Sequence, residues 1–537
     1  MSDIVKLRNR ATKVLVSGLL AVATFSMALA QETPKKGGTL VYALTADPVG
    51  LNAGITNDMN TLQTATQVFS QIITVDKDGK IHGDLAESWS MAPDGMTYTF
   101  NIRKGVKWHD GRPLTADDVR WALTEITMKY NPNASTSFGA VASVEAPDDT
   151  TLVFHMKRPF PAFMPWSLIN QWIYPRHIYE GSDPRQNEHN YKNVIGSGPF
   201  KFKEWVRGDH ITFERNPDYY VKGQPYLDRV VARFIPDAGA RVIGLETGEI
   251  DYLNIYSLPA SAVPDLRKNP DITVFEHRKR ANYGGIMAHL NLRNPNLAKK
   301  EVRQALSFAV DRKLITERAF GGIGTPASGP ISSYQDEFFN LAIAGRYPYD
   351  PKKAEELLDK VSPKGPDGKR FSLRITYARA GEGGGLQTAA EIIREEFRPL
   401  GIDLILEPKD QAVWMESAHI KWDFDLSMGS YQTGPDPAIA VSRLYITKNI
   451  QKLNGRNLMG YSNPRVDDLF DQGEAEVDQA KRVQIYNEIQ QIMADDVPAL
   501  WLWDRLSVLA YRNRVKGDLF GGAHMENFAN VWVTDGK

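Results

Sequence analysis

The sequence predicts an α/β protein with more than one domain, and three observations lead to this fold class. Residues 371–377 and 402–406 have the pattern of strands, with a helix expected over residues 386–398 between them. This βαβ order implies parallel strands. Apolar residues also recur at helical spacing between residues 300 and 313. Finally, about 507 residues remain after a predicted export segment, more than one hydrophobic core usually spans.

The first thirty residues have the pattern of a secretory signal peptide. Four basic residues precede an apolar run over residues 14–29, and Ala28 and Ala30 flank Leu29 just before Gln31. The run is shorter than the ~20 residues that a membrane-spanning helix needs. We therefore expect cleavage near Ala30 and an exported chain. The sequence has no cysteine to carry a lipid anchor, so retention in the periplasm is the expectation.

Composition excludes several function classes. The formal charge is −1, and the first thirty residues, with four basic residues and one aspartate, leave −4 for the mature chain. This balance gives no reason to expect nucleic acid as a partner. The absence of cysteine excludes disulfides, a thiol nucleophile and thiolate metal ligands. The ten histidines show no ligand spacing, so we expect neither a metal nor a cofactor.

The N-terminal elements follow from local pattern. Residues 38–44 have the pattern of an opening strand, which a turn over 45–48 ends. Asp94 and Gly95 have turn chemistry and the next residues alternate, which predicts a hairpin. Thr115 precedes Asp117 and apolar residues at helical spacing, so a capped amphipathic helix begins there.

Two motifs have both a functional and a structural interpretation. His109 and Asp110 together are compatible with acid/base chemistry, but a structural histidine beside a turn is the preferred interpretation. The glycine-rich loop over 381–385 follows a strand, where open α/β sheets hold ligands. It lacks the spacing of a dinucleotide fingerprint, so we expect no cofactor there.

The block over residues 85–123 carries the strongest signal in the chain. It contains Trp89, the Asp94-Gly95 pair, Arg103, the run GVKWHDG and an Asp117-Asp118-Val119 triplet. It closely resembles the signature block of bacterial extracellular solute-binding proteins of the peptide-binding family. Further segments that are similar to the family pattern are 196–205, 216–220, 248–252, 301–312, 329–331 and 457–469.

The resemblance implies a two-lobed periplasmic-binding-protein fold of type II, cluster C-like, with an extra subdomain and a hinge of two crossing strands. The hinge strands would cross near residues 287–291 and 501–505. The implied boundaries are 1–30 for the signal peptide, 31–66 with 196–286 and 505–537 for lobe I, 67–195 for the extra subdomain, and 287–504 for lobe II.

The resemblance also implies a ligand-binding segment over residues 427–437. In peptide-binding members the backbone of this segment pairs with an extended ligand, and an aspartate three residues before the acidic residue-proline pair holds the peptide's ammonium group. Thr433 occupies that position here. A buried ammonium without a counter-charge is costly, so Asp436 or Asp58 would have to replace the missing carboxylate. Otherwise the solute is a blocked peptide, an opine-like conjugate or an oligosaccharide.

Other candidate positions come from the helix start after residue 51, the NxxGYSNP motif and the tryptophans near the hinge. For Asp58 and Asp436 the alternative interpretation is an ordinary helix N-cap. Trp501 and Trp503 are expected to share one strand face, as core residues or as a stacking platform for sugars. The candidate ligand-binding residues are Asn57, Asp58, Met59, Gly429, Tyr431, Gln432, Thr433, Asp436, Asn457 and Trp501.

The resulting functional prediction is a transport-linked receptor, not an enzyme. It would capture a small-molecule or peptide solute, with a peptide as the preferred expectation, and deliver it as a monomer to an inner-membrane ABC permease. An exported hydrolase is the weaker alternative, because the sequence has neither a GxSxG elbow nor an HExxH helix. An exported chaperone would need an exposed apolar patch.

Overall fold

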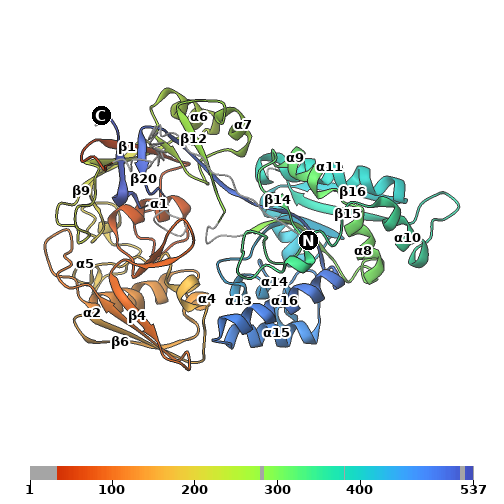
Figure 1. The fold of residues 1–537 in the computed structure, drawn as a ribbon, viewed down its shortest axis with the longest axis horizontal. Coiled ribbons are helices and arrows are strands. Elements are labelled where there is room, and N and C mark those ends of the chain that lie inside the picture. Colours follow the sequence, from red (N-terminus) through yellow and green to blue (C-terminus); the bar gives the residue numbers. More distant parts are fainter. Residues whose placement is uncertain (1–32, 279–283, 380, 520–526, 536–537) are drawn as a thin grey trace, which may run out of the picture. The chain divides into compact units, whose positions relative to one another are not determined.

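The computed structural model describes residues 33–278, 284–379, 381–519 and 527–535. The predicted signal peptide and its cleavage site therefore lie outside the described residues. The described residues from Lys35 onward form one compact unit, built around two large mixed sheets (Figure 1). Within the described ranges, no helix is both long and apolar enough to cross a membrane.

The first large sheet has seven strands and contains the predicted opening strand. β1 pairs in parallel with β10, while β9 and β8 follow as antiparallel neighbours. The strand order is β12 (Ile272–His277), β19 (Ser507–Arg512), β11 (Tyr252–Leu253), β1 (Thr39–Leu44), β10 (Arg229–Phe234), β9 (His210–Arg215) and β8 (Phe200–Val206).

The second large sheet has six strands, and helices α8 to α11 gather around it (Figure 1). β15 and β16 pair in parallel and α11 (Gly385–Phe397) connects them, which confirms the predicted βαβ unit. The strand order is β14 (Thr325–Pro326), β18 (Ala499–Asp504), β13 (Gly284–Leu290), β17 (Leu426–Gln432), β15 (Phe371–Ala378) and β16 (Ile402–Lys409).

Smaller sheets complete the fold. Four antiparallel strands, all within the predicted subdomain, have the order β4 (Ala86–Met91), β5 (Thr97–Ile102), β7 (Thr151–Met156) and β6 (Val141–Asp148). The first two form the predicted hairpin, with Gly95 in the left-handed conformation at φ 69°. The two-stranded sheets pair β2 (Ile73–Val75) with β3 (Ile81–Gly83), and β20 (Val515–Gly517) with β21 (Val531–Val533).

Several helices begin at a residue whose side chain caps them. The Thr115 hydroxyl caps α2 (Ala116–Trp121) in a reciprocal arrangement with Asp118, as predicted. The predicted helix over residues 300–313 is wrong in one respect, because it is two helices, α8 (Lys300–Phe308) and α9 (Arg312–Ala319). Asp311 lies between them and caps α9 by accepting a hydrogen bond from the Leu314 amide. The other main helices are α1 (Met59–Val68), α6 (Ala238–Thr247), α10 (Pro351–Val361), α12 (Gln411–Met415), α13 (Pro437–Ala440), α14 (Ser442–Tyr445), α15 (Pro464–Ala475) and α16 (Gln479–Asp496).

The chain changes from one large sheet to the other at two neighbouring places. β12 and β19 are partners in the first sheet, and β13 and β18 are partners in the second. The connections therefore run from β12 to β13 and from β18 to β19. The first change falls between His277 and Gly284, a few residues before the predicted boundary, and the second falls between Asp504 and Ser507. Two adjacent connections of this kind are what a hinge between two rigid bodies requires.

A β-bulge in β18 lies beside this hinge. Ile286 pairs with Trp503 but the next residue, Met287, pairs with Trp501, so Leu502 is an extra residue in β18. The prediction that Trp501 and Trp503 share one face is therefore wrong. Trp501 packs in the cluster that contains Tyr431, whereas Trp503 packs with Leu502 in the cluster on the helical side of the sheet.

Gly285 should be essential to this pairing, because a Cβ at this position would lie 1.8 Å from the Trp503 carbonyl oxygen. Forcing extra atoms into a packed site typically costs about 1–3 kcal/mol. We expect Gly285→Ala to lower the free energy of unfolding by at least that amount, measured by urea denaturation. Gly50→Ala is the matched control, because its Cβ would meet nothing closer than 3.4 Å. Equal stabilities of the two variants would contradict this account.

Candidate functional site

The predicted binding segment begins as β17 and leaves part of that strand with an open edge. β13 pairs with β17 along Leu426–Gln432. On the other side, β15 pairs only with Leu426, Ser427 and Met428. Among the described residues, no strand pairs with that second edge of residues 429–432. An unpaired strand edge presents backbone N–H and C=O groups to another extended chain.

Glycine and aromatic residues shape the strand around this edge. A Cβ on Gly429 would lie 2.9 Å from the Trp414 ring, so only glycine fits beneath that indole. Tyr431 is buried, whereas Gln432 is exposed. Trp501 is buried beneath the sheet and its indole N–H donates to the Tyr445 hydroxyl at 3.0 Å. Trp501 is thus a packed core residue in this structure, as the structural interpretation proposed.

Asp504 is a buried carboxylate on the face of the sheet that Tyr431 occupies. Gly285 is the partner of Tyr431 on one side and of Asp504 on the other. Across this glycine, the Tyr431 hydroxyl donates to Asp504 Oδ1 at 2.8 Å. The Ser333 amide and hydroxyl donate to Oδ2 at 2.8 and 2.7 Å. No ion pair joins Asp504 to a cation in the described part of the chain.

Burial raises the pKa of Asp504 to about 6, although the hydrogen bonds from Ser333 and Tyr431 lower it. Sequence reasoning missed this residue. The only available signal was an aspartate at the end of the otherwise apolar run ALWLW, and its side of the strand depends on the bulge at Leu502.

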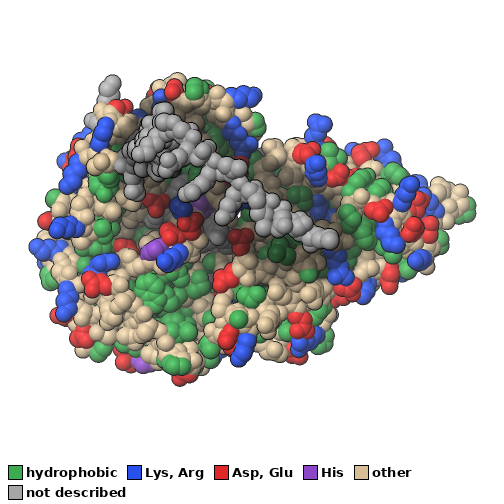
Figure 2. Space-filling view, in the orientation of Figure 1, with side chains coloured by type: hydrophobic (Ala, Val, Ile, Leu, Met, Phe, Trp, Pro, Cys, Tyr) green, Lys and Arg blue, Asp and Glu red, His purple; other side chains and the backbone are tan. Residues whose placement is uncertain are grey.

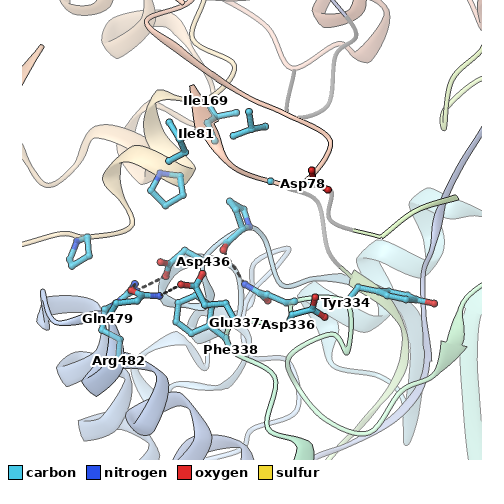
Figure 3. Close-up of a pocket in the computed structure, with 16 residues that line it drawn as sticks. Asp78, Ile81, Ile169, Tyr334, Asp336, Glu337, Phe338, Asp436, Gln479 and Arg482 are labelled. Atoms are coloured by element: carbon cyan, nitrogen blue, oxygen red, sulfur yellow. Dashed lines mark hydrogen bonds and ion pairs between the residues drawn. The ribbon is translucent and has the colours of Figure 1, made fainter. Parts of the chain in front are cut away.

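Asp436 is buried and already has a cationic partner. Arg482 Nη2 donates to Asp436 Oδ1 at 2.7 Å, and both side chains are at most 3% exposed. The same oxygen accepts a hydrogen bond from the Ala438 amide, so Asp436 is the N-cap of α13, as the alternative interpretation held. In Figure 3, Asp436 faces Arg482, and Gln479 and Glu337 lie beside this pair.

The Asp436–Arg482 pair borders a cavity of about 360 Å³. Pro435, Tyr334 and Gln335 also line it, and the Gln335 amide donates to the Pro435 carbonyl at 3.1 Å. The opposite wall comes from the predicted subdomain and includes Ile81 and Ile169 (Figure 3). The segment that follows β17 therefore ends at a cavity.

Thr433 is fully buried, and its hydroxyl has no hydrogen-bond partner within the described ranges. The position at which the resemblance expects an aspartate thus carries a neutral and unsatisfied polar group. Of the two replacement carboxylates considered, Asp436 is paired with Arg482, and Asp58 accepts from both the Thr61 amide and hydroxyl at 2.8 Å. Both carboxylates act as helix caps in this structure.

The other candidates are dispersed. Asn57 is exposed and Met59 packs against the core at the start of α1. Asn457 is buried, and its amide donates to three carbonyl groups and accepts from the Gly460 amide. All four hydrogen bonds hold its own loop together. The structure therefore brings the β17 segment together with Asp436 near one cavity, but it gives Asn457 a structural contact set.

His109 has the structural contacts that the preferred interpretation expects, and it does not pair with Asp110. The ring Nδ1 accepts from the Gly196 amide at 3.2 Å and Nε2 contacts the Gly198 carbonyl at 3.1 Å. Burial lowers the pKa of His109 to about 4, so the ring is neutral. Asp110 instead contacts His177 at 2.7 Å. In the described part of the chain, no group of three or more His, Asp or Glu side chains is arranged to hold a metal.

The charge of Asp504 should make stability depend on pH. A carboxyl group with a raised folded-state pKa stabilises the fold most when it is protonated, and this contribution is lost as pH rises through about 6. Asn retains the hydrogen-bonding shape without the charge. We expect Asp504→Asn to be more stable than the parent at pH 8, by up to about 3 kcal/mol for a shift near two pKa units.

The same comparison at pH 4 should show a much smaller difference, because the parent Asp504 is then protonated. Urea unfolding at both pH values measures this. A variant that is less stable than the parent at pH 8 would show that the carboxylate contributes more through its hydrogen bonds than burial costs.

Comparison with known proteins identifies the family to which this architecture belongs. The family model for bacterial extracellular solute-binding proteins, family 5 (middle), matches residues 80–452. The oligopeptide-binding protein AppA of Bacillus subtilis is 29% identical over 500 residues, which cover 90% of this chain and 89% of AppA. The solved structure of AppA with a nonapeptide has a TM-score of 0.72, with 27% identity over 94% of this chain and all of AppA.

Two further solved structures have the same fold. The substrate-binding protein CtaP of Listeria monocytogenes has a TM-score of 0.81 at 29% identity, covering 93% of this chain and all of CtaP. AgaA of A. tumefaciens R10, solved with agropinic acid, has a TM-score of 0.70 at 27% identity, covering 93% of this chain and 99% of AgaA. The fold is thus the two-lobed fold that these binding proteins share, and the chain belongs to family 5 of the bacterial extracellular solute-binding proteins.

Proposed function

We propose that this protein is the receptor of an ABC import system and that its solute is a peptide. The open edge of β17 at residues 429–432 is the observation that carries the proposal. An extended peptide can add to such an edge through main-chain hydrogen bonds, which leave its side chains free. An opine or an oligosaccharide has no repeating amide backbone to pair in this way. The nonapeptide bound by AppA supports this choice of solute.

The transport cycle follows from the hinge. The solute enters between the lobes, the lobes rotate about the β12–β13 and β18–β19 connections, and the solute-bound form docks on an inner-membrane permease. Closure is a population shift, limited by the difference in solute affinity between the two states. We propose that the protein acts as a monomer, that it catalyses no reaction, and that residues 1–30 are a signal peptide cleaved near Ala30 for export to the periplasm.

The neutral site around Thr433 favours a receptor that tolerates a blocked amino terminus. Neither Asp58 nor Asp436 offers a carboxylate without a partner, since the first caps α1 and the second is paired with Arg482. An ammonium group placed beside Thr433 would lose hydration without gaining an ion pair. The peptide amino terminus is therefore held as a polar group and not as a charge.

Thermal-shift titration of the mature chain tests this function, because a ligand that binds only the folded state raises stability with its concentration. Free and N-acetylated peptides of two to nine residues are compared, with opines and oligosaccharides as controls. We expect peptides to stabilise the protein, with less than tenfold difference in Kd between free and acetylated forms. Stabilisation by opines or oligosaccharides alone would contradict a peptide solute.

Thr433→Asp restores the carboxylate that the family pattern contains at this position. We expect it to improve the preference for free over acetylated peptides by tenfold or more, with Thr433→Ser as the matched control. The ratio of the two affinities is the readout, because a buried new carboxylate also lowers stability. An unchanged ratio would show that the peptide terminus lies elsewhere. Incubation of the same peptides with the protein, followed by mass spectrometry, should reveal no cleavage.

A further inference from the structure

Arg443 and Arg456 are two half-buried cations for which the structure provides no anionic partner. Both line a cavity of about 410 Å³ beside α14. Within the described part of the chain, neither guanidinium group takes part in a hydrogen bond or an ion pair, and the Nε atom of Arg443 is buried without a partner. A guanidinium group carries five N–H donors. Buried donors are normally satisfied, so these donors call for an acceptor.

The two cations also lie close enough to affect each other. Burial, and in second place the positive charge of Arg456, lowers the pKa of Arg443. Nη1 of Arg443 lies 3.9 Å from the position that a Cβ on Gly455 would take, so this group packs against the residue before Arg456. Two like charges in a partly desolvated cavity repel each other, and an anion between them would remove this repulsion.

The remaining charged residues of the cavity do not supply that anion. Lys448 pairs with Asp471 at 3.3 Å, and Arg158 of the predicted subdomain pairs with Glu474 at 2.7 Å. The cavity is lined by four cationic and two acidic side chains. Both acidic side chains are already paired with another cation, so the positive charges of Arg443 and Arg456 are not balanced by an acidic side chain of the cavity.

We propose that Arg443 and Arg456 form a binding site for an oxyanion, a carboxylate or a phosphate group. Planar guanidinium groups bind two oxygens of such a group at once, which a lysine cannot do. The anion has two possible sources, a free inorganic oxyanion or a carboxylate of the transported solute. The second source rests on the proposed function, and it is suggested by the chain order, because α13 and α14 directly follow the β17 segment.

The first experiment needs no solute. Thermal unfolding of the mature chain is followed in sodium phosphate and in sodium chloride of equal ionic strength. We expect phosphate to stabilise the parent protein with a saturable dependence on concentration. Arg443→Gln and Arg456→Gln should each raise the apparent Kd for phosphate by tenfold or more. Arg185→Gln is the matched control, because Arg185 is exposed and paired with Asp183 at 2.9 Å.

The second experiment compares peptides that end in a free carboxylate with the same peptides as C-terminal amides. A tenfold or greater preference of the parent for the free acid, lost in Arg443→Gln and Arg456→Gln, identifies the solute carboxylate as the anion. Arg443→Lys and Arg456→Lys retain the charge, and they replace the glutamine variants if those fail to fold.

The proposal is overturned if phosphate stabilises the parent no more than chloride does and if peptide acids and amides bind equally. Phosphate stabilisation that persists unchanged in folded variants of both arginines would also overturn it. Failure of every peptide to bind would count against the proposed function alone, because the phosphate experiment still tests this site.

Discussion

The backbone contact between β13 and β18 at Gly285 is the constraint on which the candidate site depends. Gly285 has Tyr431 on one side and Asp504 on the other, and a Cβ at this position would collide with the Trp503 backbone. The Tyr431 hydroxyl donates to the Asp504 carboxylate across this glycine. Because Leu502 is an extra residue in β18, Trp503 packs in the cluster on the helical side of the sheet, and Asp504 lies on the face that Tyr431 occupies. A β-bulge re-aims the side chains that follow it. The connection from β18 to β19 begins at the next residue, so β17 and this connection are joined through one hydrogen-bonded sheet.

Buried charge is handled in three different ways around the site. Asp436 is neutralised by Arg482, in a pair that also caps α13. Asp504 accepts hydrogen bonds from neutral donors only, and these do not offset burial, which raises the pKa of its carboxyl group. Arg443 lacks even a neutral acceptor for its buried Nε. Removing charge from water is costly, so each arrangement demands a different compensation. The first compensation is complete within the protein. Protonation provides the second, and the proposed anion would provide the third.

The surface gives a further reason to look for function in enclosed sites. On the face in Figure 2, acidic and basic side chains are interspersed, in keeping with a formal charge of −1 for the chain. Interspersed charges of this kind produce no strong field of one sign over this face. The proposed main-chain hydrogen bonds at the β17 edge are short-range contacts and need no such field.

The sequence by itself determined the family, the α/β class and most local elements, because these depend on nearby residues. Thr115 capping α2, the Asp94-Gly95 hairpin and the βαβ unit at β15 and β16 each require information from a few adjacent positions. The division of the predicted 300–313 helix was missed, although the cap residue Asp311 was visible in the sequence.

Only the tertiary structure decided which partners the polar groups of the candidate site have. From the sequence, Asp436 was equally suited to a ligand contact and to a helix cap. In the structure its carboxylate pairs with Arg482, which lies 46 positions away in the sequence. Asp504 was assigned no role, because strand alternation without the bulge places it on the opposite face from Trp501. No sequence pattern indicated that Arg443 and Arg456 line the same cavity. Hydrogen bonds and charge interactions between distant segments depend on how the chain folds back on itself. Local periodicity in the sequence does not predict them.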